Sequence, residues 1–267
     1  MKKITFALLV TIISCTTSHL PSPVQVSQSS NLITDGKLYT AVFQQRAAEY
    51  RALCFQAFNI ARLRLDEALQ NKTGRPMAVI TDIDETILDN SPYAVHQALQ
   101  GKDYDQSVWN NWSDLSKADT VPGSATFLKY AASHGVEVYY ITNRGENEKM
   151  NTLLNLQKFN LPDADSLHIF LKQTTSSKES RRQMVMDNHD VVLLLGDNLG
   201  DFSSLFDKKT EDIRLQNANT SYVEFGKRFI VLPNPGYGDW ESSMFSYNYY
   251  TPAQKDSVIR KLLKNFR

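Results

Sequence analysis

Two short acidic segments hold the residues of this chain that are best suited to chemistry. Asp82 and Asp84 directly follow one apolar run, and Asp197 and Asp201 directly follow another. A carboxylate can attack phosphorus and form an aspartyl phosphate, which divides the hydrolysis of a phosphate ester into two easier steps. We therefore predict that Asp82 is the nucleophile, and that Asp84 protonates the leaving oxygen and then activates water.

A divalent cation is the expected partner of these carboxylates. Several carboxylates facing an anionic phosphate repel it, and Mg²⁺ removes this repulsion by accepting carboxylate, water and phosphate oxygens. Asp197 and Asp201 are one helical turn apart, so both can reach one ion if Asp201 lies on the first turn of a helix. The sequence therefore predicts a magnesium site.

Polar residues that suit phosphate oxygens occur elsewhere in the chain. Thr142 and Asn143 end another apolar run, and Lys178 follows a short polar stretch. Stabilisation of a transferring phosphoryl group requires donors that neutralise its developing charge. The Thr142 hydroxyl and the Lys178 ammonium are the expected donors.

Alternating apolar runs and helical patterns must position these residues. Four apolar runs and a plausible fifth read as buried strands, at residues 77–81, 136–141, 167–171, 191–195 and 229–232. Helical patterns lie before and between them, at residues 36–71, 124–134, 147–159 and 178–188. This alternation predicts an α/β, Rossmann-like domain with a central parallel sheet and helices on both faces. Ligands of such sheets bind beyond the carboxyl ends of the strands, where all the acidic and polar residues above fall.

Residues 89–121 interrupt the alternation and are expected to form a small cap. The segment is rich in Asn, Asp, Ser, Tyr and Trp and has no long apolar run. Its Tyr93, Trp109 and Trp112, with Tyr237 from further along the chain, are candidates for substrate contacts. Aromatic walls stack a nucleobase by about 1–3 kcal/mol and tolerate different bases. Trp240 is read as a core residue.

The N-terminus has the pattern of an export signal. Lys2 and Lys3 precede a ten-residue apolar run that is too short to span a bilayer, and Cys15 follows it. The segment before Cys15 resembles the bacterial lipobox, which predicts that the signal is residues 1–14 and that Cys15 carries lipid. Residues 15–35 are predicted to be a flexible tether, and residues 36–267 the catalytic domain. Thr16 is not an acidic retention signal, which favours the outer membrane and leaves its periplasmic or surface face open.

Charge and the remaining reactive residues exclude other classes of protein. Lys plus Arg and Asp plus Glu both number 29, so the formal net charge is zero, and nucleic acid is not an expected partner. Cys54 is expected to be a buried structural thiol without a disulfide partner. The histidines show no metal-ligand spacing and are expected to be structural or solvent-facing: His19, His96, His134, His168 and His189.

Four segments resemble, in order, the motifs of the haloacid dehalogenase superfamily of phosphatases. They are Asp82-Ile83-Asp84-Glu85-Thr86, Ile141-Thr142-Asn143, Lys178, and Gly196-Asp197-Asn198-Leu199-Gly200-Asp201. The stretch Lys178-Glu179-Ser180-Arg181 matches the family pattern and favours Lys178 over Lys172. The resemblance implies a haloacid dehalogenase fold.

Three stretches are similar, more specifically, to the bacterial class C acid phosphatases, which are secreted or lipid-anchored. They are residues 49–53, 82–91 and 233–241. The resemblance implies a nonspecific Mg²⁺-dependent acid phosphomonoesterase that acts on small phosphate monoesters such as nucleoside 5′-monophosphates. It also implies that the metal is held by Asp82, the backbone carbonyl of Asp84 and Asp197, with Asp201 supporting the ion or its waters.

Two other functions and two properties stay open at this stage. The fold also suits a catalytically weak protein that binds phosphate or nucleotides, and a phosphotransferase that hands the phosphoryl group to an alcohol. The intact Asp82 motif favours an enzyme over a binding protein. Neither the physiological substrate nor the oligomeric state can be read from the sequence, and a homodimer is compatible with it.

Overall fold

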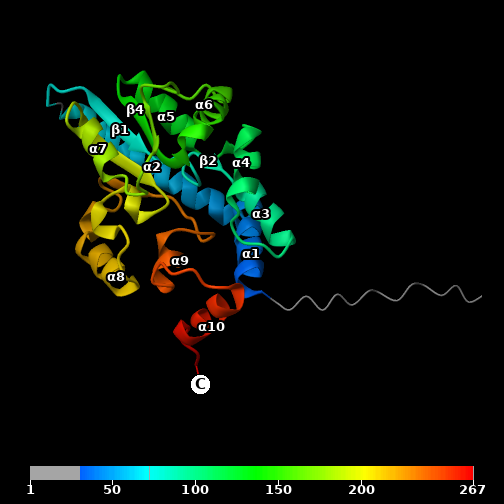
Figure 1. Cartoon of the computed structure of the whole chain (residues 1–267). Coiled ribbons are helices and arrows are strands. Elements are labelled where there is room, and N and C mark those ends of the chain that lie inside the picture. The colour runs from blue at the N-terminus through cyan, green and yellow to red at the C-terminus, as the bar shows by residue number, and fades with distance from the viewer. Residues whose placement is uncertain (1–30, 72, 267) are drawn as a thin grey trace, which may run out of the picture.

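A five-stranded parallel sheet forms the centre of the protein. The computed structural model describes residues 31–71 and 73–266 (Figure 1), and the strand order of its sheet is β5-β4-β1-β6-β7. The strands are β1 (Met77–Thr81), β4 (Glu137–Gly145), β5 (Ile169–Lys172), β6 (Asp190–Gly196) and β7 (Phe229–Val231). All five predicted strands are present, and the predicted α/β fold is confirmed.

Helices cover both faces of the sheet. Helices α2 (Ala48–Gln70), α5 (Ser124–Ser133) and α6 (Lys149–Lys158) pack on the face to which Val79 and Val138 contribute. Helix α7 (Glu179–Met186) covers the other face, where Val185 packs in a cluster with Ile80 and Leu194. Every residue of β1 is buried, as expected for the central strand of a doubly covered sheet.

The helical pattern predicted over residues 36–71 is two helices rather than one. Helix α1 (Leu32–Arg46) begins four residues before the expected start, and Ala47, with φ −82° and ψ 129°, separates it from α2. Helix α1 packs on the cap, whereas α2 packs on the sheet. The apolar spacing runs on from residue 37 to residue 71 without Gly or Pro, so the sequence carries no signal for a break at Ala47.

The cap lies between two short strands. Strands β2 (Leu88–Asp89) and β3 (Asp119–Thr120) pair antiparallel and bracket helices α3 (Ser91–Leu99) and α4 (Gln106–Asp114). These two strands lie at the ends of the insertion expected at about residues 89–121. Because its two ends are paired, the cap leaves and rejoins the body at one place.

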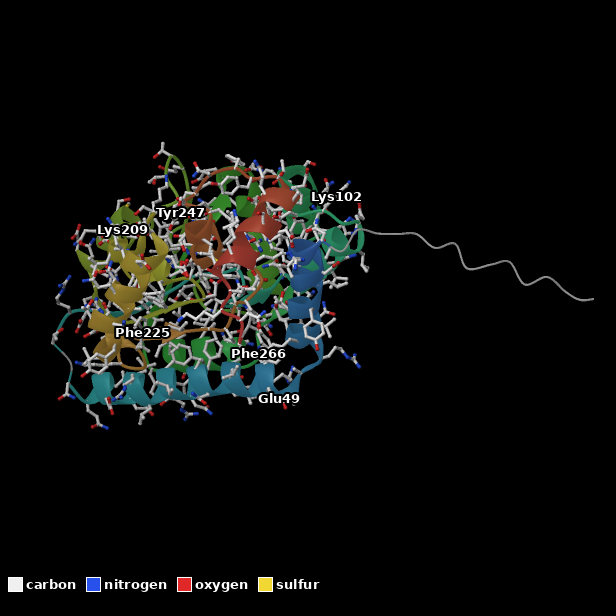
Figure 2. The ribbon with its side chains drawn as sticks, turned by 90° about the horizontal axis from the view of Figure 1, so that it is seen from below. Glu49, Lys102, Lys209, Phe225, Tyr247 and Phe266 are labelled. Atoms are coloured by element: carbon white, nitrogen blue, oxygen red, sulfur yellow. The ribbon has the colours of Figure 1, made fainter. Side chains whose placement is uncertain are left out.

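The C-terminal part of the chain returns to the cap side of the molecule. It contains α8 (Glu211–Thr220), α9 (Asp239–Met244) and α10 (Pro252–Leu262). The described residues also form four short 3₁₀ helices: η1 (Glu146–Glu148), η2 (Leu199–Asp201), η3 (Ser204–Phe206) and η4 (Tyr222–Glu224). Figure 2 shows α10 beside α1, with Lys102 on the neighbouring loop that follows α3. Within residues 31–71 and 73–266, the structure has no helix with the length and apolar character needed to cross a bilayer.

Two predictions about single residues have opposite outcomes. Cys54 is fully buried in the core, as predicted. The prediction for Trp240 is wrong, because 42% of its surface is exposed and its indole nitrogen bonds the Tyr237 carbonyl. Cys15, His19 and the predicted signal peptide lie outside the described residues.

Candidate active site

Three carboxylates meet at the carboxyl edge of the sheet. Asp82 follows β1, Asp197 follows β6, and Asp201 ends η2. Strands β1 and β6 are neighbours, and the amide of Asp82 donates to the Leu195 carbonyl at 2.9 Å, so the acidic segments begin side by side. One carboxylate oxygen from each aspartate lies within 4.8 Å of the others.

Short-range contacts hold Asp201 towards this cluster. Its Oδ2 accepts from the Asn198 amide at 2.9 Å, and Asn198 caps η2 through the amide of Gly200. Gly196 leaves room for the carboxylate, because a Cβ there would lie 2.4 Å from the Asp201 side chain. The tight 3₁₀ turn thus brings together two aspartates that the sequence analysis expected to lie on one helical turn.

Buried negative charge dominates the electrostatics of this cluster. Burial, together with the charges of Asp201 and Asp84, raises the pKa of Asp82 to about 7 against the opposing effect of Lys178. Burial, together with the charges of Asp201 and Asp82, raises the pKa of Asp197 well above its usual range. Protons or cations must therefore offset the repulsion between these groups.

The donor set fits a hard divalent cation. The cluster offers three carboxylates without sulfur or imidazole, the oxygen chemistry that Mg²⁺ prefers. Lys178 bonds Asp82 Oδ1, and its Nζ lies 2.7 Å from Asp201 Oδ1. Asn234 donates to Asp197 Oδ2 at 2.7 Å and fixes the orientation of that carboxylate. Asn234 was not singled out from the sequence, although it lies in one of the stretches that resemble class C acid phosphatases.

Asp84 lines a cavity next to this cluster and forms an ion pair with an arginine. Arg144 Nη2 and Nε lie 2.7 Å and 3.1 Å from Asp84 Oδ1, and the Arg144 side chain is 2% exposed. Burial opposes a charge on Arg144, but Asp84 outweighs this effect, so the pKa of the guanidinium is raised. Strand β4 continues to Gly145 instead of ending at the expected residue 141, and this extension carries Arg144 to Asp84. Arg144 was not predicted from the sequence, although it directly follows Asn143.

Glu85 is a buried acid that supports the turn after Asp82 and Asp84. Glu85 has a positive φ of 57°, which folds the chain so that Leu88 bridges back to Asp84. Its carboxylate accepts from the Asn90 amide at 2.9 Å and from the Tyr237 hydroxyl. Burial, reinforced by the charge of Asp84, raises the pKa of Glu85 to about 8.

Thr142 and Asn143 differ in their access to the cavity. Asn143 lies on the cavity wall, and its Oδ1 accepts from Arg181 at 2.8 Å. Thr142 is fully buried, and its Oγ1 accepts from the Arg144 amide at 3.1 Å and lies 3.5 Å from Asp84 Oδ2. In this arrangement Thr142 contacts the aspartate-arginine pair rather than open space.

A cavity of about 890 Å³ connects these groups with the cap. It is lined by three of the four predicted aromatic residues, Tyr93, Trp109 and Tyr237, and also by Tyr104. Tyr93 and Trp109 pack edge to face, with ring centroids 5.2 Å apart. Trp112 does not line the cavity, because it packs against the core and donates its indole N–H to Asn90 Oδ1 at 2.8 Å.

The four described histidines lie apart from this site, as predicted. His96 and His134 are exposed, while His168 and His189 pair with Glu137 at the opposite, amino end of β4. Glu137 Oε2 lies 3.1 Å from His189 Nε2 and 3.7 Å from His168 Nε2.

Comparisons with known proteins agree on one family. The family model described as HAD superfamily, subfamily IIIB (acid phosphatase) matches residues 2–240. The class C acid phosphatase from Bacillus anthracis is 41% identical in sequence and superimposes with a TM-score of 0.85, over 88% of this chain and 99% of that chain. A structure of the same enzyme with tungstate bound gives a TM-score of 0.86 and covers 89% of this chain and 100% of the other. Among curated proteins, the class B acid phosphatase of Morganella morganii is 23% identical over 79% of this chain and 95% of its own length.

Proposed function

Because this chain belongs to the acid phosphatases of HAD superfamily subfamily IIIB, we propose that it hydrolyses small phosphate monoesters through a phosphorylated Asp82. That the chain is an acid phosphatase follows from its family, and we propose the residues and steps by which it acts. The observation that carries it is the meeting of Asp82, Lys178, Asp197 and Asp201 at the base of one cavity. Such a cluster provides a nucleophile, a cation to bind phosphate oxygens and carboxylates that can hold a metal.

The first step forms a bond between an Asp82 carboxylate oxygen and phosphorus. The bond from phosphorus to the ester oxygen breaks, and Asp84 gives its proton to the departing alcohol. In the second step Asp84 takes a proton from water, whose oxygen attacks phosphorus. The bond to Asp82 then breaks and inorganic phosphate is released, which restores both aspartates.

The charge of the phosphoryl group is met by groups on the cavity floor. Lys178 and Asn143 line the cavity beside Asp82, and we assign both to phosphate oxygens. We assign Thr142 to the same motif, where its hydroxyl supports Asp84 and Arg144. The relative from Bacillus anthracis, whose structure holds tungstate, supports an oxyanion site, because tungstate carries tetrahedral oxygens as phosphate does.

We assign the metal site to Asp82, Asp197 and Asp201, with the backbone carbonyl of Asp84. Mg²⁺, when bound there, would neutralise the carboxylates and draw charge from the phosphoryl oxygens. Lys178 and Asn234 orient the carboxylates around it. Treatment with EDTA should therefore abolish hydrolysis of p-nitrophenyl phosphate, and added Mg²⁺ should restore it; full activity in EDTA would refute the metal requirement.

The leaving group is proposed to be a small, partly aromatic alcohol such as a nucleoside. The cavity exceeds the space that a phosphate needs, and Tyr93, Trp109 and Tyr237 line it. We retain Trp112 only as a support of this wall, since it lies outside the lining residues. Comparing kcat/KM for nucleoside 5′-monophosphates, aryl phosphates and sugar phosphates tests this proposal; a preference for sugar phosphates would contradict it.

We also propose that the enzyme is exported and held to the bacterial outer membrane by lipid on Cys15. The basic, apolar and small-residue order of residues 1–15 supports this location. A tether that starts at Cys15 would keep the cavity free to meet small phosphoesters outside the cytoplasm.

A further inference from the structure

Two side chains aim the carboxylate that we assign as the general acid. Asp84 Oδ1 accepts from Asn90 Nδ2 at 2.8 Å and from Arg144 Nη2 at 2.7 Å. The Arg144 Nε lies 3.1 Å and 3.2 Å from the two carboxylate oxygens. Three nitrogen donors from two side chains leave the carboxylate little freedom to rotate.

Arg144 is itself fixed from behind. Its Nη1 donates to Thr152 Oγ1 at 3.2 Å, and its guanidinium carbon lies 5.5 Å from the centre of the Trp109 ring. The Trp109 indole N–H donates to Glu148 Oε1 at 2.8 Å, and Glu148 also accepts from the Gly145 amide. The arginine is therefore packed in one orientation rather than free in the cavity.

Asn90 is fixed in a matching way from the other side. It is 2% exposed, and its Oδ1 accepts from the Trp112 indole N–H at 2.8 Å. An indole nitrogen can only donate, so this contact turns the amide oxygen towards Trp112 and the amide NH₂ towards Asp84. The cap helix α4 thus supports both donors of Asp84 through Trp109 and Trp112, which lie on adjacent turns.

We infer that Arg144 and Asn90 are positioning residues. They hold the general acid Asp84 in the orientation from which it protonates the leaving oxygen as Asp82 attacks phosphorus, and Trp112 acts through Asn90. This inference rests on the proposed function, because it takes Asp84 as the proton donor. Protonation by a positioned acid speeds the departure of a poor leaving group far more than that of a good one. The loss of activity caused by poor positioning of Asp84 should therefore depend on the leaving group, whereas the loss caused by general damage to the site should not.

The experiment compares kcat/KM for an alkyl phosphate and for p-nitrophenyl phosphate. The value of kcat/KM reports the steps up to the release of the alcohol, so hydrolysis of the phosphoenzyme does not obscure it. Arg144→Met, Asn90→Ser and Trp112→Phe should each lower kcat/KM for the alkyl phosphate, the first two by about ten-fold or more beyond any loss on the aryl ester. Asp84→Asn should show the same selectivity, and Arg260→Met, on the exposed side of α10, should leave the ratio unchanged.

The double variant Asp84→Asn/Arg144→Met separates positioning from an independent role. If Arg144 acts only through Asp84, the double variant should be no slower on the alkyl phosphate than Asp84→Asn alone. Equal losses on both esters in Arg144→Met and Asn90→Ser, or additive losses in the double variant, would overturn the inference. If Arg144→Met does not fold, Asn90→Ser and Trp112→Phe decide the question. A failure of the proposed function is distinct, because the wild-type enzyme would then form no phosphoenzyme on Asp82.

Discussion

At the scale of single residues, most of the proposed chemistry rests on carboxylates that are buried close together. Asp82, Asp197 and Asp201 share one small volume, and burial raises the pKa values of Asp82 and Asp197. Their proximity is costly in an empty site and favourable around a cation. The neighbours that orient these carboxylates should therefore control metal affinity more than turnover.

Asn234 provides a direct test of this view. Replacing it by Ala removes the donor to Asp197 Oδ2, so the Mg²⁺ concentration for half-maximal activation should rise about ten-fold or more. Turnover at saturating Mg²⁺ should change little, because Asp82 and Asp84 stay in place. A titration of activity with Mg²⁺ measures both quantities, and Asn59→Ala, on the exposed face of α2, serves as the control. An unchanged half-activation concentration would exclude this role.

The four aspartates and Lys178 could be predicted from sequence, but the partners of these residues could not. Asp82, Asp84, Asp197 and Asp201 stand out because each follows an apolar strand, and parallel topology brings strand ends together. Arg144 carries the same signal in weaker form, since β4 runs past its apolar residues to Gly145. The use of Trp112 as a donor to Asn90 depends on the packing of α4, which periodicity alone does not determine.

At the scale of elements, a group of ion pairs that we call the clasp joins the cap to α1 and α10 beside the cavity. Lys37 of α1 and Lys255 of α10 lie 2.6 Å and 2.7 Å from the two carboxylate oxygens of Asp103, on the loop between α3 and α4. Lys37 also lies 3.2 Å from Glu241 of α9. The clasp ties the cap to two helices that are distant in sequence and adjacent in Figure 1.

The clasp should stabilise the protein even in acid. Burial would raise the pKa of Asp103, but Lys37 and Lys255 outweigh it and lower the pKa to about 2. The unfolded chain has an Asp pKa of about 3.9, so the stabilisation is fully present above about pH 4 and is lost as the pH falls towards 2. Asp103→Asn should lower the free energy of unfolding at pH 7 by about 1–2 kcal/mol, allowing for partial exposure.

Denaturant unfolding of Asp103→Asn and wild type between pH 2 and 7 measures this dependence. The difference between the two proteins should shrink as the pH falls below 4. Asp114→Asn, at an exposed position that keeps its contact to Asn151, is the matched control and should show little change. A difference that is constant over this range would mean that the ion pairs do not stabilise the cap.

The elements that pack on the sheet could be predicted more completely than those around the cavity. Strands β1 and β6 are formed by continuous apolar runs, because a sheet that is covered on both faces requires apolar residues on both. The break at Ala47 could not be predicted, since α1 and α2 bury their apolar stripes against different partners. The cap helices α3 and α4 could not be predicted from an apolar pattern, because few of their residues are buried.

At the scale of the whole molecule, the proposed anchor and the catalytic domain are separate in the chain. Helix α1 is the first described helix and begins at Leu32, and the predicted lipidated residue, Cys15, lies well before it in the sequence. The family model matches residues 2–240, which include this leading segment. We therefore expect attachment and catalysis to be separable.

Replacing Cys15 by Ser should release the enzyme from the membrane fraction without reducing its activity. The thioether that would join lipid to the cysteine sulfur cannot form on Ser, whereas every residue proposed to act in catalysis lies beyond residue 81. Fractionation of cells that express each form, followed by phosphatase assays of both fractions, measures the effect. Retention of Cys15→Ser in the membrane fraction would contradict the proposed anchor.

The central claim is that phosphate passes through Asp82, and trapping the intermediate tests it most directly. The enzyme is mixed with substrate and Mg²⁺, quenched in acid within one turnover, and digested for mass spectrometry of its peptides. Asp84→Asn should increase the trapped fraction with an aryl phosphate, because the base that activates water is lost. The account predicts one added phosphoryl group on Asp82, absent in Asp82→Asn. A phosphoryl group on another residue, or Asp82→Asn with near-normal turnover, would contradict it.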